Sequence, residues 1–356
     1  MKIKAALISM RSDSSKWIVK AMKKYFDEVD DYDIREIEVN MGKKPEVLYK
    51  GKPIQSYDCI YAKGSFRYNP LLRAISSILN DKCYMPIKPT AFTIGQDKLL
   101  TQLKLDQNNI PMPKTYLAST TKAARGILKK VNYPIIMKFP EGTQGKGVMF
   151  ADSFAGASSL LDALTALKQP FLIQEYVETG GTDIRAVVIG DEVVAMKRTA
   201  EQGEERANIH RGGKGKAITL DYEAKKIAVD AAKTIGAEIC AVDLLEGFNE
   251  YFVIEVNLSP GLQGITKTTN VDVADKIAKY LYERTKAIKT SEKEKQSSEL
   301  IKTLEKGETE RDIIMNLTFR GEKILLPELA KKISKFSEDD EVCLKLKKGR
   351  IVVEKS

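Results

Sequence analysis

The stretch E-I-C-A-V-D-L-L-E-G-F-N-E-Y-F-V-I-E-V-N at residues 238–257 decides the fold of this chain. Its two apolar halves predict the two strands of a β-hairpin. Side chains alternate between the faces of a strand, so Glu255 and Asn257 must share one face. If the two strands pair, Asp243 can lie on that face too.

These three side chains have the chemistry of a magnesium site. Two carboxylates and an amide supply oxygen ligands, which magnesium prefers and usually shares with substrate phosphates. The alternative is an edge strand whose acids are solvated. The neighbouring residues Val253, Ile254 and Val256 favour the metal, because burying carboxylates among such side chains is costly without a cation.

Strands and helices alternate on both sides of this hairpin, which predicts an α/β protein. Towards the N-terminus, the pattern predicts strands at 2–9, 33–40, 59–62, 133–139 and 171–177, helices at 70–79, 96–105 and 120–131, and a second hairpin at 183–199 that turns at Gly190-Asp191. Helices are also predicted at 221–236 and from Val271 to about Ile288. The extended connector Ile110-Pro111-Met112-Pro113 precedes one of these helices, because a residue before proline avoids the α region.

The chain divides by composition into four segments. We expect an N-terminal open α/β domain over 1–95 and a two-part domain over 96–288, with a smaller lobe at 96–180 and a larger lobe at 181–288. Residues 289–309 are almost wholly polar and predict a linker or a solvated helix. A small, mostly β module follows at 310–356, in the order strand, turn at Arg320-Gly321, helix at 326–336, strand, turn at Gly349 and strand.

Composition excludes several classes of protein. The 356 residues are 43% hydrophobic and 30% charged, which is typical of a globular chain rather than a disordered one. Four scattered cysteines without a C-x-x-C pair argue against a zinc site or a disulfide framework. No apolar run reaches the ~18 residues of a spanning helix, and the N-terminus is not typical of a signal peptide. We expect a cytoplasmic protein, and its net charge of +9 suits an anionic partner.

A glycine-rich run, Gly142-Thr143-Gln144-Gly145-Lys146-Gly147, follows the strand that ends at Lys138-Phe139. Glycines let successive backbone N–H groups point at phosphate oxygens. The spacing does not fit a Walker loop or a dinucleotide fingerprint. A glycine-rich hairpin tip is an equally good interpretation of this segment alone.

A basic cluster lies between the two predicted hairpins. Alternation places Arg206, Asn208 and His210 on one face, and Arg211 and two glycines follow. Arginine suits carboxylates and phosphates because its planar fork binds two oxygens at once. A solvated basic loop is the alternative. His210 is the single histidine of the chain, and we assign it no role as a base.

The order of these motifs resembles the RimK branch of the ATP-grasp ligases. The resemblance covers about residues 1–288 and is weakest in the first third. The segments that carry it are D-K-L-L-T-Q-L (97–103), I-P-M-P-K-T (110–115), I-M-K-F-P-E-G-T-Q-G-K-G-V (136–148), Q-E-Y-V (174–177), D-I-R (183–185), R-A-N-I-H-R-G-G (206–213), V-D-L-L (242–245) and V-I-E-V-N-L-S-P-G-L-Q-G-I-T-K-T-T (253–269).

The resemblance implies a role for each of the singled-out residues. Magnesium would bind Asp243, Glu255 and Asn257 as two ions, with manganese as a substitute. Arg206 would steady the acyl phosphate and the tetrahedral intermediate with help from Asn208, and Arg185 and Arg211 would bind substrate. The residues implied in ATP binding are Lys98, Lys138, Gly142, Thr143, Gln144, Gly145, Gly147, Gln174, Glu175, Tyr176, Val177 and Asp183.

The implied fold is the α+β ATP-grasp fold, and the implied reaction joins an activated carboxylate to an amine with ATP. The leading hypothesis is a ligase that adds L-glutamate to a protein tail or a coenzyme. The first alternative is a ligase for another amino acid or for a carrier protein. The second is a nucleotide-responsive DNA-binding regulator, because the tail resembles a swapped-hairpin AbrB module.

The charge of the tail argues against a DNA-binding role. Residues 310–356 hold 11 Lys+Arg and 9 Asp+Glu, an excess of only +2, and DNA footprints are usually concentrated basic patches. Binding to nucleic acid stays undecided at this point. We favour dimerisation or partner docking for the tail, and therefore expect a homo-oligomer.

Overall fold

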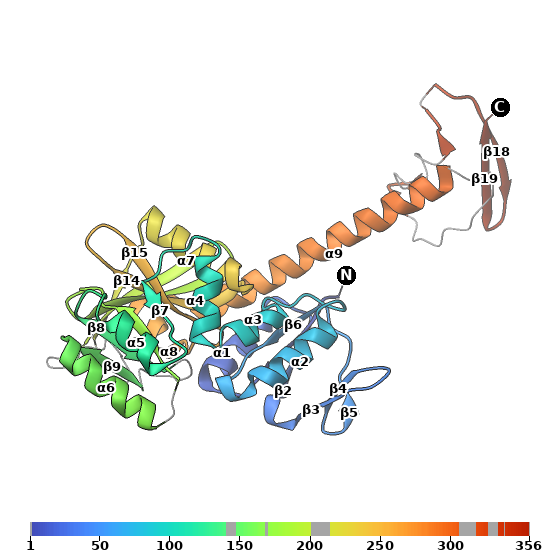
Figure 1. Cartoon of the computed structure of the whole chain (residues 1–356). Helices are drawn as coiled ribbons and strands as arrows, with labels where there is room; N and C mark the ends of the chain where they lie inside the picture. Colours follow the sequence, from blue (N-terminus) through green and yellow to red (C-terminus); the bar gives the residue numbers. More distant parts are fainter. Residues whose placement is uncertain are drawn as a thin grey trace. The chain divides into compact units, whose positions relative to one another are not determined.

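The chain folds into two compact units, Met1–Thr285 and Lys286–Ser356, which are described separately. The computed structural model in Figure 1 describes residues 2–139, 147–167, 170–200, 214–305, 318–326, 334–337 and 339–355. Among these residues, no helix combines the length and the apolar character needed to cross a membrane.

The first unit begins with a three-stranded parallel sheet of order β2-β1-β6, as expected for an open α/β arrangement. Its elements are β1 (Lys4–Ser9), α1 (Asp13–Met22), β2 (Glu28–Asp33), β6 (Cys59–Ala62) and α2 (Asn69–Leu79). The strand predicted at 33–40 is wrong in its first half. The side chain of Asp33 accepts a hydrogen bond from Arg35 N, which starts a 3-10 turn at Ile34–Glu36. The chain then enters a small antiparallel sheet, β3 (Ile37–Asn40), β4 (Glu46–Tyr49) and β5 (Lys52–Pro53).

A four-stranded antiparallel sheet of order β7-β10-β8-β9 has its own hydrophobic core. Its strands are β7 (Thr115–Tyr116), β8 (Ile135–Lys138), β9 (Val148–Ala151) and β10 (Leu172–Glu175). The helices α5 (Thr121–Leu128) and α6 (Phe154–Ala166) lie beside the sheet (Figure 1). Leu128, Met137 and Leu161 are fully buried there, so this lobe can hold its shape independently of the other core.

The largest sheet has five antiparallel strands in the order β13-β12-β11-β14-β15. The strands are β11 (Thr182–Ile189), β12 (Glu192–Thr199), β13 (Lys214–Ile218), β14 (Ile239–Glu246) and β15 (Tyr251–Asn257). Both predicted hairpins are confirmed, β11–β12 with its turn at Gly190-Asp191 and β14–β15. Helix α7 (Tyr222–Ile235) contacts this sheet and buries Ala224, Ala228 and Ala231 at helical spacing.

The parallel sheet and the five-stranded sheet belong to one continuous core. The main chain joins them, since Lys88 N donates to Gly236 O at 2.9 Å and Glu238 N donates to Pro86 O at 2.8 Å. The short helices α3 (Pro89–Ile94), α4 (Lys98–Asp106) and α8 (Gln263–Thr269) complete this unit. The predicted division at residue 95 stays a prediction, and this packing crosses it.

Helix α9 (Val273–Glu305) runs past the predicted end near Ile288. Of the two interpretations of the polar segment after residue 289, the helix is therefore correct as far as Glu305. The second unit also contains two hairpins, β16 (Thr318–Arg320) with β17 (Lys323–Leu325) and β18 (Val342–Lys347) with β19 (Arg350–Lys355). The turn at Gly349 agrees with the sequence, and most of the helix predicted at 326–336 lies outside the described residues.

The hairpin turn at Gly190 makes a specific prediction. Gly190 has a φ of +63°, and an added Cβ would overlap the ring of Tyr280, whose hydroxyl is fixed by a bond to Glu238. We expect Gly190→Ala to lower the free energy of unfolding by about 1–2 kcal/mol from backbone strain and by a further 1–3 kcal/mol from overpacking.

Gly51→Ala is the matched control, because Gly51 has a φ of +75° but open space around its Cα. Urea unfolding should show the strain alone in this variant. Equal losses in the two variants would contradict the close packing of Tyr280 on the turn.

Candidate active site

A row of charged side chains crosses one face of the five-stranded sheet. Asp243 on β14 is the direct partner of Glu255 on β15 and of Arg185 on β11. Two residues before Arg185 on β11, and so on the same face, Asp183 is the direct partner of Arg198 on β12. Directly paired residues share a face, so the register confirms the expectation that the acids of the two strands lie together.

Asp243 is the most tightly held member of this row. Its Oδ1 accepts from Arg185 Nε at 2.9 Å, and its Oδ2 accepts from Arg185 Nη2 at 2.6 Å. Arg198 Nη2 lies 3.0 Å from the same Oδ2. Burial alone would raise the pKa of Asp243, but the two guanidinium groups hold it at about 2. The carboxylate is therefore ionised throughout the physiological range.

Arg198 is a central residue that the sequence analysis missed. Its side chain is 7% exposed and forms a forked ion pair with Asp183, with Nη2 at 2.7 Å from Oδ2. It also reaches Asp243, so it joins two acids that would otherwise repel each other. An arginine at an inward position of an apolar strand, opposite the aspartate of the same hairpin, was the available signal. The structure places Asp183 and Arg185, predicted to bind ATP and substrate, in these ion pairs.

Glu255 lacks comparable compensation. Burial raises its pKa, and so does the charge of Asp243, against smaller opposite effects from Lys98 and Arg185. A divalent cation would relieve exactly this excess of buried negative charge, so the donor set fits magnesium.

The remaining lone pairs leave room for such a cation. Asn257 uses its Oδ1 to accept from Ser259 N at 2.9 Å, and each oxygen of an amide or carboxylate has two lone pairs. Among the described residues, Asp243 Oδ1 likewise accepts one hydrogen bond, from Arg185 Nε. Within the described ranges, no three His, Cys, Asp or Glu side chains could jointly hold a metal, so a cation held by Asp243 and Glu255 would need further ligands such as Asn257 and substrate oxygens.

Two lysines lie close enough to Glu255 to act on its charge. Lys138, on β8 of the smaller sheet, is buried and donates from Nζ to Gln174 Oε1 at 2.9 Å. Gln174 is itself fixed through Thr115 Oγ1 at 2.7 Å. The pKa of Lys138 is lowered to about 8, mainly by burial and also by the charge of Lys98, while the charge of Glu255 opposes both effects. These mutual effects bring the two lysines and the metal candidates into one electrostatic cluster.

Lys98 reaches this cluster from the start of a helix. It is the first residue of α4, whose N-cap Asp97 accepts from Leu99 N at 2.7 Å and from Leu100 N at 3.1 Å. The helix begins two residues later than predicted because Asp97 caps it. This end of a helix favours anions, in agreement with the predicted contact to phosphate.

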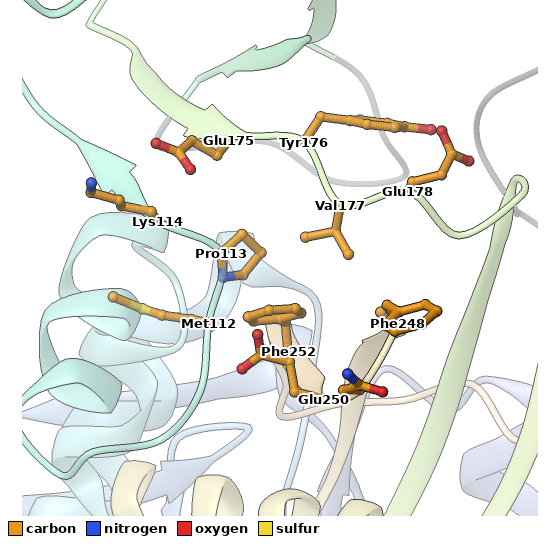
Figure 2. A pocket seen from close by; sticks show the side chains of 12 residues that line it. Met112, Pro113, Lys114, Glu175, Tyr176, Val177, Glu178, Phe248, Glu250 and Phe252 are labelled. Atoms are coloured by element: carbon orange, nitrogen blue, oxygen red, sulfur yellow. The ribbon is translucent and has the colours of Figure 1, made fainter. Parts of the chain in front are cut away.

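A cavity of about 600 Å³ lies beside the smaller sheet (Figure 2). Glu175, Tyr176 and Val177 line it from one side, and Phe248 and Phe252 from the other. These first three residues belong to the segment predicted to hold adenine. The fourth, Gln174, points to Lys138 instead. Tyr116 donates to Glu175 Oε1 at 2.7 Å, which fixes that carboxylate.

Several predicted residues lie outside the described residues: Gly142, Thr143, Gln144, Gly145, Arg206, Asn208 and Arg211. Gly147 is described. It has a φ of +77°, and its carbonyl accepts from Phe139 N at 3.2 Å. This bond continues the β8–β9 pairing as far as the end of the glycine-rich run.

Comparisons with known proteins agree with this geometry. Residues 95–281 match the RimK-like ATP-grasp domain. A probable alpha-L-glutamate ligase from Marinomonas sp. (strain MWYL1) is 36% identical over 289 residues, covering 79% of this chain and 95% of the relative. Another from Cellvibrio japonicus (strain Ueda107) is 34% identical, covering 82% and 98%. The fold is similar to the ATP-grasp ligase PsnB, solved with a minimal precursor, Mg and ADP, at a TM-score of 0.63 and 19% identity, covering 80% and 98%.

The bridging role of Arg198 can be tested by stability. Arg198→Met leaves two buried carboxylates with one guanidinium, so the free energy of unfolding should fall by about 3–5 kcal/mol. Arg73→Met is the control, because Arg73 is exposed and, within the part of the chain that the structure describes, donates only to Thr93 Oγ1. Adding Asp183→Asn to Arg198→Met should recover part of the loss in urea unfolding. A variant as stable as the control would contradict the bridge.

Proposed function

The chain belongs to the RimK-like ATP-grasp family and is an ATP-dependent ligase, and we propose that it joins L-glutamate to an acidic acceptor. The observation that carries the proposal is the direct pairing of Asp243 with Glu255 across β14 and β15, with Lys98 and Lys138 close enough to Glu255 to act on its charge. Acids that suit a cation beside lysines that suit phosphates are what phosphoryl transfer requires, since its catalysis is mainly positioning and charge stabilisation.

ATP-grasp ligases use ATP with magnesium, and the neighbour PsnB was solved with Mg and ADP. In our proposal Glu255, Asn257 and Asp243 hold magnesium, which would neutralise charge on the transferred phosphoryl group. Two ions, or manganese in their place, are part of the same proposal. Arg185 and Arg198 keep Asp243 ionised and oriented. They also occupy some of its oxygen lone pairs, so Asp243 would bind the metal through the lone pairs that remain.

The nucleotide would lie between the two antiparallel sheets. Adenine would occupy the cavity lined by Glu175 and Val177, where apolar side chains and a few polar groups can fix a flat ring. Lys138 is prepared for phosphate because Gln174 orients its ammonium and burial strengthens its interaction with anions. Gly142 to Gly147 would add backbone N–H groups.

The proposed reaction has two steps. An acceptor carboxylate attacks the γ-phosphorus of ATP and forms an acyl phosphate, with ADP as the leaving group. The glutamate amine then attacks the acyl carbon, an amide forms, and phosphate leaves. Arg206, assisted by Asn208, would stabilise the charge of the tetrahedral intermediate, and Arg211 would bind substrate carboxylate.

The amino acid and the acceptor need a direct experiment. We would measure phosphate release with ATP and magnesium across a panel of amino acids and acidic acceptors, and identify the products by mass spectrometry. Addition of 129 Da per glutamate residue would support the proposal. Release with a different amino acid, or only with a carrier protein, would favour the first alternative. No release with any pair, despite normal nucleotide binding, would contradict ligase activity on these substrates.

For the tail we propose partner docking or dimerisation, and hence an oligomeric enzyme. Leu344 and Leu346 on β18 and Ile351 on β19 are exposed, and the register places them on one face of the hairpin. An isolated two-stranded hairpin is marginal in water, which favours a covered state. The AbrB resemblance stays a prediction, because the match to the ATP-grasp domain ends at residue 281. Nothing in the comparisons supports the DNA-binding alternative.

The metal assignment makes a direct prediction. Glu255→Gln keeps the shape of the side chain but removes a charge, so we expect ATP turnover to fall at least about a hundredfold, as for loss of a group that stabilises the transition state. The fold should persist, since burial already disfavours the charged form of Glu255. Steady-state phosphate release at increasing magnesium concentrations measures the effect.

Glu192→Gln is the matched control, because Glu192 pairs with Lys276 at the exposed end of β12. This variant should turn over like the wild type at every magnesium concentration. Full activity of Glu255→Gln would refute the metal assignment.

A further inference from the structure

The parallel sheet ends in a place where ligands commonly bind. Strand β1 is central, with β2 on one side and β6 on the other, so the chain leaves β1 in one direction and later returns on the opposite side. In open α/β sheets, ligands bind outside the carboxyl ends of the strands at this point of reversal. Here β1 ends at Ser9 and β6 ends at Ala62, and Lys63 N donates to Ile8 O at 2.9 Å. Lys63 therefore lies at the carboxyl ends of β1 and β6.

Lys63 is an unusual lysine for such a position. It is 3% exposed, and among the described residues its Nζ donates to one carbonyl, Pro260 O at 3.2 Å. An ammonium has three donors, and burying a cation without an acid is costly. Burial lowers the pKa of Lys63 to about 8, with no acidic group acting against it. A bound anion would therefore stabilise the charged form of Lys63.

The segment that covers Lys63 comes directly from the proposed metal strand. Asn257 ends β15, and Pro260 follows three residues later, a span of at most about 11 Å. The same segment is fixed to the N-terminal part through Ser14, whose Oγ accepts from Leu262 N at 2.8 Å and donates to Gln263 Oε1 at 3.0 Å. The Lys63 ammonium thus lies near the place where the acceptor carboxylate would meet the γ-phosphate.

We propose that Lys63 binds a second carboxylate of the acceptor, one or two residues away from the carboxylate that is activated. The inference rests on the proposed ligase function and adds to it a determinant for acidic acceptors. Two residues of extended peptide span about 7 Å, which suits a site beside, but not at, the metal. Lys138, which our proposal places at the phosphates, is likewise a buried lysine whose ammonium donates to a neutral oxygen, Gln174 Oε1.

The test uses the full chain with ATP, magnesium and L-glutamate, and three acceptor peptides: Ala-Ala-Glu-Glu, Ala-Ala-Gln-Glu and Ala-Ala-Glu-Gln. The wild type should lose roughly 10- to 100-fold in kcat/KM with one of the two glutamine peptides, the range for one hydrogen bond between charged groups. Lys63→Met should show the same loss with Ala-Ala-Glu-Glu, and no further loss with that glutamine peptide. The KM for ATP should change less than about threefold.

Two further variants separate binding from a structural role. Ser14→Ala removes the other bonds to the covering segment, and it should keep the wild-type preference among the peptides. Lys63→Arg keeps the charge and should keep part of that preference. If Lys63→Met slows all three peptides equally, or weakens ATP equally, Lys63 only positions the Pro260 segment and the proposal is overturned.

The same peptides separate a failure of the proposed ligase function from a failure of the proposed role of Lys63. If the wild type consumes none of the three peptides, peptide acceptors are excluded and the proposal for Lys63 falls with them. If the wild type is active but does not discriminate among the peptides, the ligase function stands and the role of Lys63 is refuted.

Discussion

The paired arginines around Asp243 are the interaction on which the rest of the site depends. A carboxylate at this depth would gain a proton unless cations held it ionised, and Arg185 and Arg198 do so from two neighbouring strands. Their planar forks fix the carboxylate in orientation as well as in charge. This arrangement also requires a fixed register of the sheet, because a shift of one residue in a strand would turn its charged side chain to the other face.

The elements around this row of charged side chains add two lysines to it. The smaller sheet has a separate core and contributes Lys138, while α4 contributes Lys98. Cations and acids thus come from different elements and meet only after the lobes pack. The parallel sheet shares its core with the larger lobe, so Lys63 and the segment after Asn257 are held together by the same packing. In our proposal, one fold therefore positions the cation site, the phosphate site and the edge for an acceptor.

Periodicity explains what the sequence could predict. Asp243 and Glu255 follow from the period of two along strands with a clear turn between them, and the hairpin at Gly190 follows from turn chemistry. Asp183 and Arg185 were recognised, but Arg198 was not, because an arginine near the end of a strand is usually exposed. Its place opposite Asp183 follows from the turn at Gly190-Asp191. Lys63 gives no signal in the sequence, since a lysine after a strand is usually solvated. Its burial arises from a segment almost 200 residues away.

The part of helix α9 beyond Ile288 could not be predicted from the sequence pattern. Its residues are nearly all polar and give no apolar stripe, so the pattern could not separate a linker from a helix. The strands β9 and β13 were missed for a related reason: each is short and takes its place from a neighbour, β8 or β12, rather than from its own alternation.

A crystal structure of the chain with ADP and magnesium would test the central claim most directly. The account predicts a metal ion about 2.0–2.1 Å from oxygens of Glu255 and Asn257, with Asp243 still held by Arg185, and adenine against Glu175 and Val177. A magnesium nucleotide bound with none of the oxygens of Asp243, Glu255 or Asn257 near the metal would contradict it.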